Sequence, residues 1–207
     1  PGPGDASPGT GEAARAPAAL TGNFSYTDRF DAATLHPRWL FLRNPPADAC
    51  SLSDKGLTLH PAFGTIRQTK PLAALFCRQQ HTSFAAETEL TFAPTSSRRL
   101  AGITVFQDEA HHLLFGKTLL GGRPALVLKR TDKTEMLIGS CLLPAGDAPV
   151  RLRIEADGRY YSFFYALDGS DNWQPVAIGV DASNVSTSCS GGFIGAMIGL
   201  YATRHNE

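Results

Sequence analysis

The stretch Ser190-Gly-Gly-Phe193-Ile-Gly-Ala-Met-Ile-Gly-Leu-Tyr201-Ala-Thr203 is the feature that decides the fold. Chain ends fray unless they are tied down, yet this one is too apolar to lie in water. We therefore expect residues 194–202 to form a buried strand in the middle of the core, beside strands from much earlier in the chain. Gly191, Gly192 and Phe193 predict an exposed turn that carries an aromatic side chain into this strand.

Outward from this stretch, the preceding chain reads as short strands separated by turn residues. Residues 100–106 form an apolar run, and Gly121-Gly122 is a two-residue hairpin signal between two further strands. Residues 150–155 alternate between polar and apolar side chains, turn at Asp157-Gly158 and return as residues 159–165. About a dozen strands of this kind follow one another, with no amphipathic helix of ten residues. The pattern predicts an all-β sandwich of two antiparallel sheets.

Composition divides the chain into two parts. Residues 1–20 are rich in Pro, Gly and Ala and predict a flexible linker, because such a sequence cannot bury enough surface to offset its ordering entropy. Residues 21–207 are expected to form one β-sandwich domain. A linker at the start also suggests that something precedes it, so we expect this domain to be one module of a larger protein.

The charge balance argues against two classes of partner. The 207 residues include 19 basic and 19 acidic side chains, which cancel, so there is no electrostatic case for binding nucleic acid or an anionic membrane. No apolar run is long enough to span a bilayer. We expect neither nucleic acid nor a membrane among the partners.

Cysteines and sequons bear on the cellular compartment. The four cysteines are Cys50, Cys77, Cys141 and Cys189. Their spacing fits no zinc module, and they allow either two disulfides in one of three pairings or four buried thiols. Asn23-Phe-Ser25 and Asn184-Val-Ser186 are glycosylation sequons, which matter only on a surface in the secretory pathway. They favour an extracellular, secreted protein.

A first candidate site lies near the start of the sandwich. A strand that begins at Arg38 would place Trp39, Phe41 and Arg43 on one face, because side chains alternate along a strand. Sugars are bound by flat aromatic faces together with planar polar groups that grip paired hydroxyls. Trp39 and Arg43 are therefore candidates for carbohydrate binding or for contact with another domain.

A second candidate site is the polar run after Leu75-Phe76-Cys77. On a continued strand Arg78 and Gln80 would share one face, while Gln79 and His81 would share the other. Arg78, Gln80 and His81 thus join the candidates for contact with a sugar or with another domain. The alternative is a polar network across the sheet, in which Arg43 and Arg78 pair with Glu87 or Glu89.

Glu87 and Glu89 also have a catalytic interpretation. They lie on one face of an alternating strand over residues 86–92, about 7 Å apart. Retaining glycosidases need two carboxyl groups about 5–5.5 Å apart. Sandwich-fold glycanases usually present a third acid on the same strand, but the next position on this face is Thr91. A charged strand with one solvated face is the simpler account.

Metal binding has a weak candidate at the start of the sandwich. Asp28 and Asp31 could hold calcium through their carboxylate oxygens. Most aspartates in such positions form turns instead. We expect no cofactor, with calcium as the one metal that these residues allow.

Several stretches together match a known family. They are Asp28-Arg-Phe-Asp31, Leu35-His-Pro-Arg-Trp39, Leu42-Arg-Asn-Pro45, Gly56-Leu-Thr-Leu59, Arg78-Gln-Gln-His81-Thr-Ser-Phe84, Gly191-Gly-Phe-Ile-Gly195 and Gly199-Leu-Tyr201. In this order and spacing the chain resembles the C-terminal concanavalin A-like domain of glycoside hydrolase family 43 β-xylosidases and α-L-arabinofuranosidases. The same domain type is classed as carbohydrate-binding module family 91. The resemblance covers residues 23–203.

The resemblance implies a non-catalytic role. In that family the catalytic residues lie in an N-terminal five-bladed β-propeller, and no propeller-sized segment is present in this sequence. An aromatic residue from a loop of the sandwich can help to close the xylose-binding subsite of the propeller, and Phe193 best matches that residue. Arg43, Arg78 and His81 match recurring family positions. The implied partners are the catalytic propeller and a xylan-type sugar.

Three hypotheses follow. The first is an accessory module of a xylan-degrading enzyme, which either binds xylan-type sugars itself or completes the pocket of the catalytic domain. The second is a stand-alone lectin-like sandwich outside any enzyme. The third is a single-domain glycanase that uses Glu87 and Glu89.

Overall fold

The fold is all-β, as the sequence predicts. The computed structural model describes residue 22 and residues 25–61, 63–167, 169–192 and 195–204. The first seven strands are β1 (Leu40–Phe41), β2 (Cys50–Ser53), β3 (Gly56–Leu59), β4 (Ala73–Arg78), β5 (Ser83–Leu90), β6 (Arg99–Asp108) and β7 (His111–Leu120). The remaining elements are β8 (Arg123–Asp132), β9 (Thr134–Leu142), β10 (Val150–Asp157), β11 (Tyr160–Leu167), β12 (Gln174–Asp181), the 3₁₀-helix η1 (Ser183–Val185), the helix α1 (Thr187–Ser190) and β13 (Met197–Arg204).

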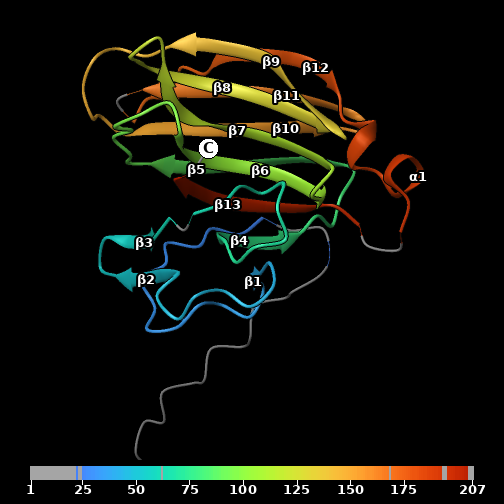
Figure 1. Ribbon diagram of the computed structural model, residues 1–207, viewed down its shortest axis with the longest axis horizontal. Coiled ribbons are helices and arrows are strands. Elements are labelled where there is room, and N and C mark those ends of the chain that lie inside the picture. The colour runs from blue at the N-terminus through green and yellow to red at the C-terminus, as the bar shows by residue number, and fades with distance from the viewer. Residues whose placement is uncertain (1–21, 23–24, 62, 168, 193–194, 205–207) are drawn as a thin grey trace, which may run out of the picture.

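Two antiparallel sheets form the sandwich. The larger sheet has seven strands in the order β1-β4-β13-β6-β7-β8-β9, and the smaller has four in the order β12-β11-β10-β5. Strands β2 and β3 form a separate hairpin. Figure 1 shows the two sheets lying one over the other, with β1, β2 and β3 on the opposite side of the molecule from β9 and β12. This is the expected two-sheet sandwich.

The last strand is central, as its apolar sequence predicts. β13 lies between β4 and β6, and Tyr201 is paired with Ala74 on one side and Gly102 on the other. The side chain of Tyr201 is buried with 1% exposure. The strand runs from Met197 to Arg204 and therefore starts and ends later than predicted, while Phe193 and Ile194 lie outside the described residues.

The larger sheet is covered on both faces. Its inner face packs against the smaller sheet: Val105 and Phe115 of the larger sheet and Phe163 of the smaller sheet belong to one cluster and are fully buried. Its outer face carries a second apolar cluster that includes Phe76 and Tyr201. Ile66 and Leu72, from the segment before β4, cover part of this second cluster. Burial on both faces explains why the middle of β6 reads as a nearly continuous apolar run.

The predicted hairpins are present. Gly121 and Gly122 join β7 to β8 with φ angles of 58° and 77°, the left-handed conformation that a type I′ hairpin turn requires at both positions. Gly158 joins β10 to β11 with a φ angle of 58°. Glycine adopts a positive φ angle at each of these turns without the steric penalty that a Cβ atom would cause.

The strand expected from Arg38 onward is wrong. β1 contains only Leu40 and Phe41, and the backbone N–H of Trp39 instead donates to the carbonyl of His36 at 3.0 Å, which makes a turn. Arg43 has a positive φ angle of 68°, so it leaves the extended conformation altogether. Trp39, Phe41 and Arg43 therefore do not form one face of a regular strand.

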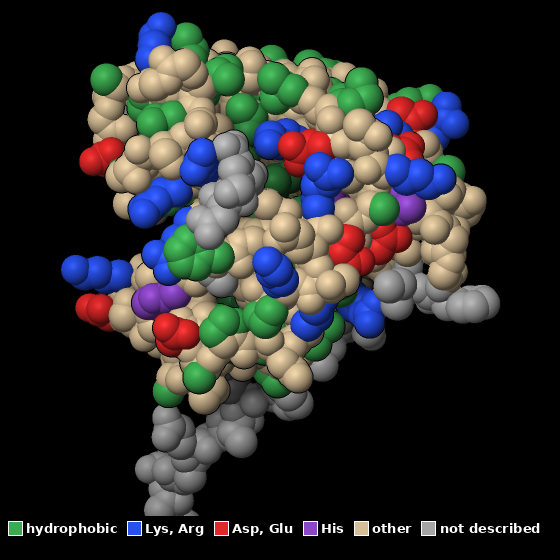
Figure 2. All heavy atoms as spheres, in the orientation of Figure 1, with side chains coloured by type: hydrophobic (Ala, Val, Ile, Leu, Met, Phe, Trp, Pro, Cys, Tyr) green, Lys and Arg blue, Asp and Glu red, His purple; other side chains and the backbone are tan. Residues whose placement is uncertain are grey.

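One edge strand of each sheet, β9 in the larger and β12 in the smaller, lies on the same side of the sandwich (Figure 1). The edge strands β9 and β12 carry the exposed apolar side chains Met136, Leu137, Ile138, Leu142 and Ile178. Figure 2 shows hydrophobic side chains along the upper part of the molecule, where Figure 1 places these strands. Exposed apolar side chains on edge strands are typical of places where another protein packs. In the described residues, neither short helix has the length and apolarity needed to cross a membrane.

Candidate functional site

The segment before β1 is held by a partly buried hydrogen bond between the side chains of Trp39 and Asp28. The indole Nε1–H of Trp39 donates to Oδ2 of Asp28 at 2.7 Å, and the backbone N–H of Phe30 donates to Oδ1 at 2.9 Å. The rings of Trp39 and Phe30 pack with their centroids 5.2 Å apart. This geometry uses the polar edge of the Trp39 ring within the protein, and it favours a structural role for Trp39 over a sugar platform.

Replacing Asp28 with alanine should lower the free energy of unfolding by about 2 kcal/mol, because it removes two hydrogen bonds to a charged acceptor. Urea denaturation followed by tryptophan fluorescence measures the change. Asp31→Ala is the matched control: Asp31 is exposed and forms no hydrogen bond or ion pair with other described residues, so its loss should change stability by less than about 0.5 kcal/mol. Equal effects of the two substitutions would contradict the structural role of the Asp28–Trp39 contact.

The same contact bears on the calcium prediction. Both carboxylate oxygens of Asp28 already accept hydrogen bonds, from Phe30 and from Trp39. Within the described ranges, no group of three or more His, Cys, Asp or Glu side chains is arranged to hold a metal ion. The structure therefore gives no support to calcium at Asp28 and Asp31.

Arg43 joins two distant parts of the chain. Its guanidinium donates through Nη1 to the carbonyl of Lys70 at 3.1 Å, and through Nη2 it forms an ion pair with Glu109 in the turn between β6 and β7. The predicted pairing of Arg43 with Glu87 or Glu89 is wrong. Glu109 is 66 positions away in sequence, and nothing in the local pattern identifies it.

The second candidate stretch lies where β4 ends and β13 begins. Gln79 connects three strands: its backbone N–H donates to the carbonyl of Ala196 at 3.1 Å, and its Oε1 accepts from the Tyr161 hydroxyl at 2.9 Å. Arg78 faces Met197 across the strand pair; its side chain is exposed and bonds to none of the described residues. Gln80 is also exposed, and His81 is half-buried. Gln79 fixes the geometry of this end, and Arg78 is left open toward solvent.

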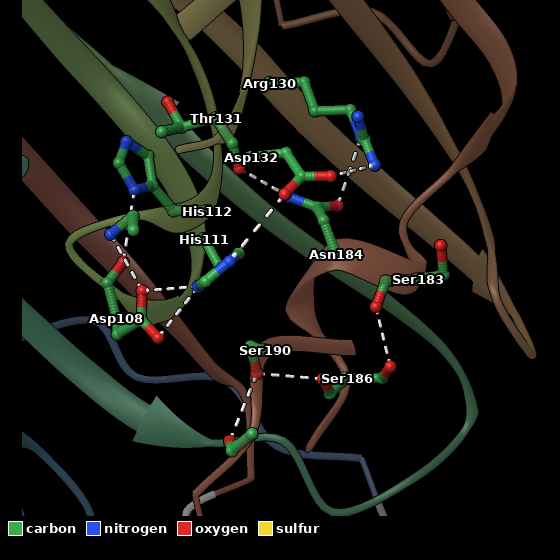
Figure 3. Close-up of polar contacts among 12 residues, drawn as sticks. Asp108, His111, His112, Arg130, Thr131, Asp132, Ser183, Asn184, Ser186 and Ser190 are labelled. Atoms are coloured by element: carbon green, nitrogen blue, oxygen red, sulfur yellow. Dashed lines mark hydrogen bonds and ion pairs between the residues drawn. The ribbon is translucent and has the colours of Figure 1, made fainter. Parts of the chain in front are cut away.

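The loop that leads to Phe193 is anchored beside this end by the polar contacts of Figure 3. Asn184 is 2% exposed; its Nδ2 donates to the carbonyl of Thr131 at 2.7 Å and its Oδ1 accepts from Nε of Arg130 at 3.2 Å. The hydroxyl of Ser190 donates to the carbonyl of Ser186 at 2.9 Å. These bonds order the chain as far as Gly191. Phe193 itself lies outside the described residues.

Burial of Asn184 also corrects one sequence argument. A side-chain amide that is buried and bonded at both atoms is not accessible for glycosylation in the folded chain, so the sequon at Asn184 gives no support to secretion. Asn23 lies outside the described residues. The four cysteines are all free thiols, and Cys189 is exposed, so neither the disulfide interpretation nor the four buried thiols holds.

The carboxylate of Glu87 forms ion pairs with two arginines of β10. Its Oε2 accepts from Arg151 at 3.0 Å and its Oε1 from Arg153 at 2.5 Å. Both arginines also lie over the ring of Trp173, with 4.8 and 5.4 Å between guanidinium carbon and ring centroid. Both carboxylate oxygens of Glu87 are thus already bonded to side chains of the protein. The geometry therefore favours the polar face over a catalytic Glu87–Glu89 pair.

His112 lies beneath the outer face of the larger sheet, beside Thr131. Burial lowers the pKa of His112 to about 4, although nearby Asp108 and Glu135 act to raise it. Its Nδ1 must donate to the backbone carbonyl of Asp108 at 3.2 Å, since a carbonyl only accepts. Figure 3 shows the ring next to Thr131, its register partner. The imidazole is therefore neutral at physiological pH and has a structural role.

A groove lies on the outer face of the larger sheet and was not predicted from the sequence. Its volume is about 420 Å³, and its lining residues are Thr65, Ile66, Arg67, Gln68, Ser97, Arg98, Leu100, Leu114, Lys129, Glu135, Tyr201 and Thr203. The sheet supplies the floor, and the segments at residues 65–68 and 97–98 supply the walls. Arg67, Gln68 and Arg98 come from irregular segments, where periodicity carries no signal.

Comparison with known protein families gives one match that covers the whole sandwich. The family model described as "Beta xylosidase C-terminal Concanavalin A-like domain" matches residues 27–207. This confirms the resemblance drawn from the sequence motifs.

Curated relatives and solved structures agree with this match. The chain is 26% identical over 182 residues to a non-reducing end α-L-arabinofuranosidase of Bacteroides ovatus, which covers 87% of this chain and 34% of the relative. It is 28% identical over 193 residues to a xylosidase/arabinosidase of Butyrivibrio fibrisolvens, with coverage of 86% and 34%. A crystal structure of a GH43_12 protein from the capybara gut metagenome superposes with a TM-score of 0.79 at 28% identity, covering 87% of this chain and 35% of that one. The chain therefore spans about a third of the length of these relatives.

Proposed function

The chain belongs to the family of β-xylosidase C-terminal concanavalin A-like domains, and on this premise we propose that it is the non-catalytic accessory module of a glycoside hydrolase that degrades xylan-type polysaccharides. One observation carries the proposal: the sandwich corresponds to only about a third of relatives that are named as xylosidases and arabinofuranosidases. The chemistry of the whole enzyme is then expected in the other two thirds.

The module has two complementary tasks in this proposal. One is to bind xylan-type sugars through stacking and hydroxyl hydrogen bonds, without making or breaking a bond. The other is to dock against an N-terminal catalytic β-propeller and complete its pocket. The proposed contact face is the end of the sandwich that carries Arg78, Gln80 and His81, and we propose that Phe193 contributes to it. Three observations support it: Arg78 is exposed and bonds to no residue that the structure describes, Gln79 fixes the strand ends, and the loop is anchored up to Gly191.

We also propose that the protein is secreted, because of the size of its proposed ligand. Xylan is a polymer too large to enter a cell, so a module that binds it would act outside the cell. Because none of the described cysteines is bridged, the fold itself places no demand on an oxidising compartment.

Affinity electrophoresis tests the sugar-binding task. In native gels that contain soluble neutral xylan, the chain should be retarded relative to its mobility in gels without polysaccharide. Arg78→Gln should reduce the retardation, and Arg159→Gln, which removes the same charge at the β10–β11 turn, should not. Mobility that is unchanged by xylan would overturn the binding task and leave only the docking task.

A further inference from the structure

We propose that the groove on the outer face of the larger sheet binds an anionic sugar, that is, a sugar unit that carries a carboxylate, such as a uronic acid. The inference deepens the proposed function and rests on it, because it assumes that the module contacts a plant polysaccharide. It assigns the groove a ligand class that differs from the neutral pentoses of a xylan backbone.

The charge of the groove favours an anion. Three basic side chains, Arg67, Arg98 and Lys129, line it together with a single acid, Glu135. Lys129 and Glu135 neutralise one another through an ion pair at 2.8 Å. Arg67 therefore adds a positive charge to the groove that no other described side chain neutralises. The guanidinium of Arg67 has no hydrogen bond or ion pair to other described residues, and a guanidinium presents two parallel donors that match a carboxylate.

The shape of the groove argues against recognition of a neutral sugar by stacking. Tyr201 is the only aromatic side chain in the lining, and it is 1% exposed, so its ring offers no platform. The rest of the floor is aliphatic, from Leu100 and Leu114, which are themselves buried. Specificity must then come from the polar wall. The volume of about 420 Å³ falls within the range of small-molecule sites.

The wall that carries Arg67 is held in place before any ligand arrives. The hydroxyl of Tyr201 accepts from the backbone N–H of Ile66 at 3.0 Å, and the hydroxyl of Thr203 donates to the carbonyl of Gly64. Oε1 of Gln68 accepts from the backbone N–H of Thr65 at 3.3 Å, and its amide NH₂ has no partner in the described chain. Both anchoring hydroxyls belong to β13, the central strand. A preformed wall lowers the entropy cost of binding.

Titration with a matched pair of sugars tests the proposal. D-Glucuronate and D-glucose differ only at C6, where one has a carboxylate and the other a hydroxymethyl group. NMR chemical-shift titration of the isotope-labelled chain should give saturable shifts at the groove residues with glucuronate, and at least about tenfold weaker binding with glucose. The affinity for glucuronate should fall as NaCl is raised from about 50 to 300 mM, because exposed ion pairs are screened.

Two variants separate the groove from non-specific charge effects. Arg67→Gln combined with Arg98→Gln should reduce glucuronate affinity at least about tenfold, while the thermal midpoint falls only slightly because both side chains are exposed. Arg159→Gln changes a residue in the turn between β10 and β11, away from the groove, and should leave the affinity unchanged. Equal binding of glucose and glucuronate, equal shifts with inorganic phosphate, or retention of binding by the double variant would each overturn the proposal.

A second ligand pair keeps this inference distinct from the proposed function. A xylo-oligosaccharide with a glucuronate branch should bind more tightly than the unbranched xylo-oligosaccharide of equal length. Equal affinities for the two would overturn the anionic site, while the affinity for the unbranched sugar would still support xylan binding by the module.

Discussion

Gly102→Ala should destabilise the protein by about 3 kcal/mol or more, the largest effect that we expect from a single methyl group. Gly102 lies in β6 opposite Gly116 of β7, in the centre of the larger sheet. A Cβ at Gly102 would lie 2.1 Å from the carbonyl oxygen of Phe115 and 2.5 Å from Cα of Gly116. Both obstacles are backbone atoms, which cannot rotate away as a side chain can. The two strands must therefore separate locally and lose their ladder hydrogen bonds.

Urea denaturation followed by circular dichroism measures this effect. Gly195→Ala is the matched control, because Gly195 has no positive φ angle and a Cβ there would meet no atom within 4 Å. We expect the control to change the free energy of unfolding by less than about 0.5 kcal/mol. If Gly102→Ala were as harmless as Gly195→Ala, the close approach of β6 and β7 would be wrong.

Acid should weaken the fold through His112. The folded pKa is about 4, whereas an unfolded histidine titrates near 6.5, because burial disfavours the charged ring. Between these pH values His112 is protonated in the unfolded chain but neutral in the folded chain. Lowering the pH therefore stabilises the unfolded state, and the free energy of unfolding falls. Over the full interval the loss from this one group is about 3 kcal/mol. Below pH 4 the folded chain takes up the proton too, and this contribution levels off.

His112→Phe should remove this part of the pH dependence, since a phenylalanine ring can stack on Phe106 as the imidazole does but cannot titrate. Denaturation of both proteins at pH 7 and pH 4 gives the difference. Thr131→Val is the control: it alters the register partner of His112 without removing a titratable group, and it should retain the pH dependence of the parent. A His112→Phe protein that loses as much stability between pH 7 and pH 4 as the parent would contradict the assignment.

Local pattern was sufficient to predict most of the fold. Gly121-Gly122 fixes a hairpin because few other residues accept two successive left-handed φ angles. The apolar run that contains Tyr201 predicts an interior strand, because a strand with neighbours on both sides buries such a run. In both cases the information lies within a few adjacent residues.

Side-chain partners could not be predicted, because they depend on which strands become neighbours. Glu87 pairs with Arg151 and Arg153 since β5 lies beside β10, a pairing that no local signal reveals. The ion pair between Arg43 and Glu109 could not be predicted either, because it joins segments that are distant in the sequence. The strand expected from Arg38 is replaced by a turn at residues 36–39, where Asp28 accepts a hydrogen bond from the indole of Trp39. An alternating sequence predicts a regular strand only where no tertiary contact favours another backbone conformation.

The central claim is that this module contacts xylan-type sugar without cleaving it. NMR spectra of the isotope-labelled chain with xylohexaose, recorded over two days, measure both properties in one sample. We predict saturable shifts of protein signals while the anomeric signals of the sugar stay constant. Growth of xylose or short oligosaccharide signals, abolished by Glu89→Gln, would contradict the account and identify the chain as an enzyme.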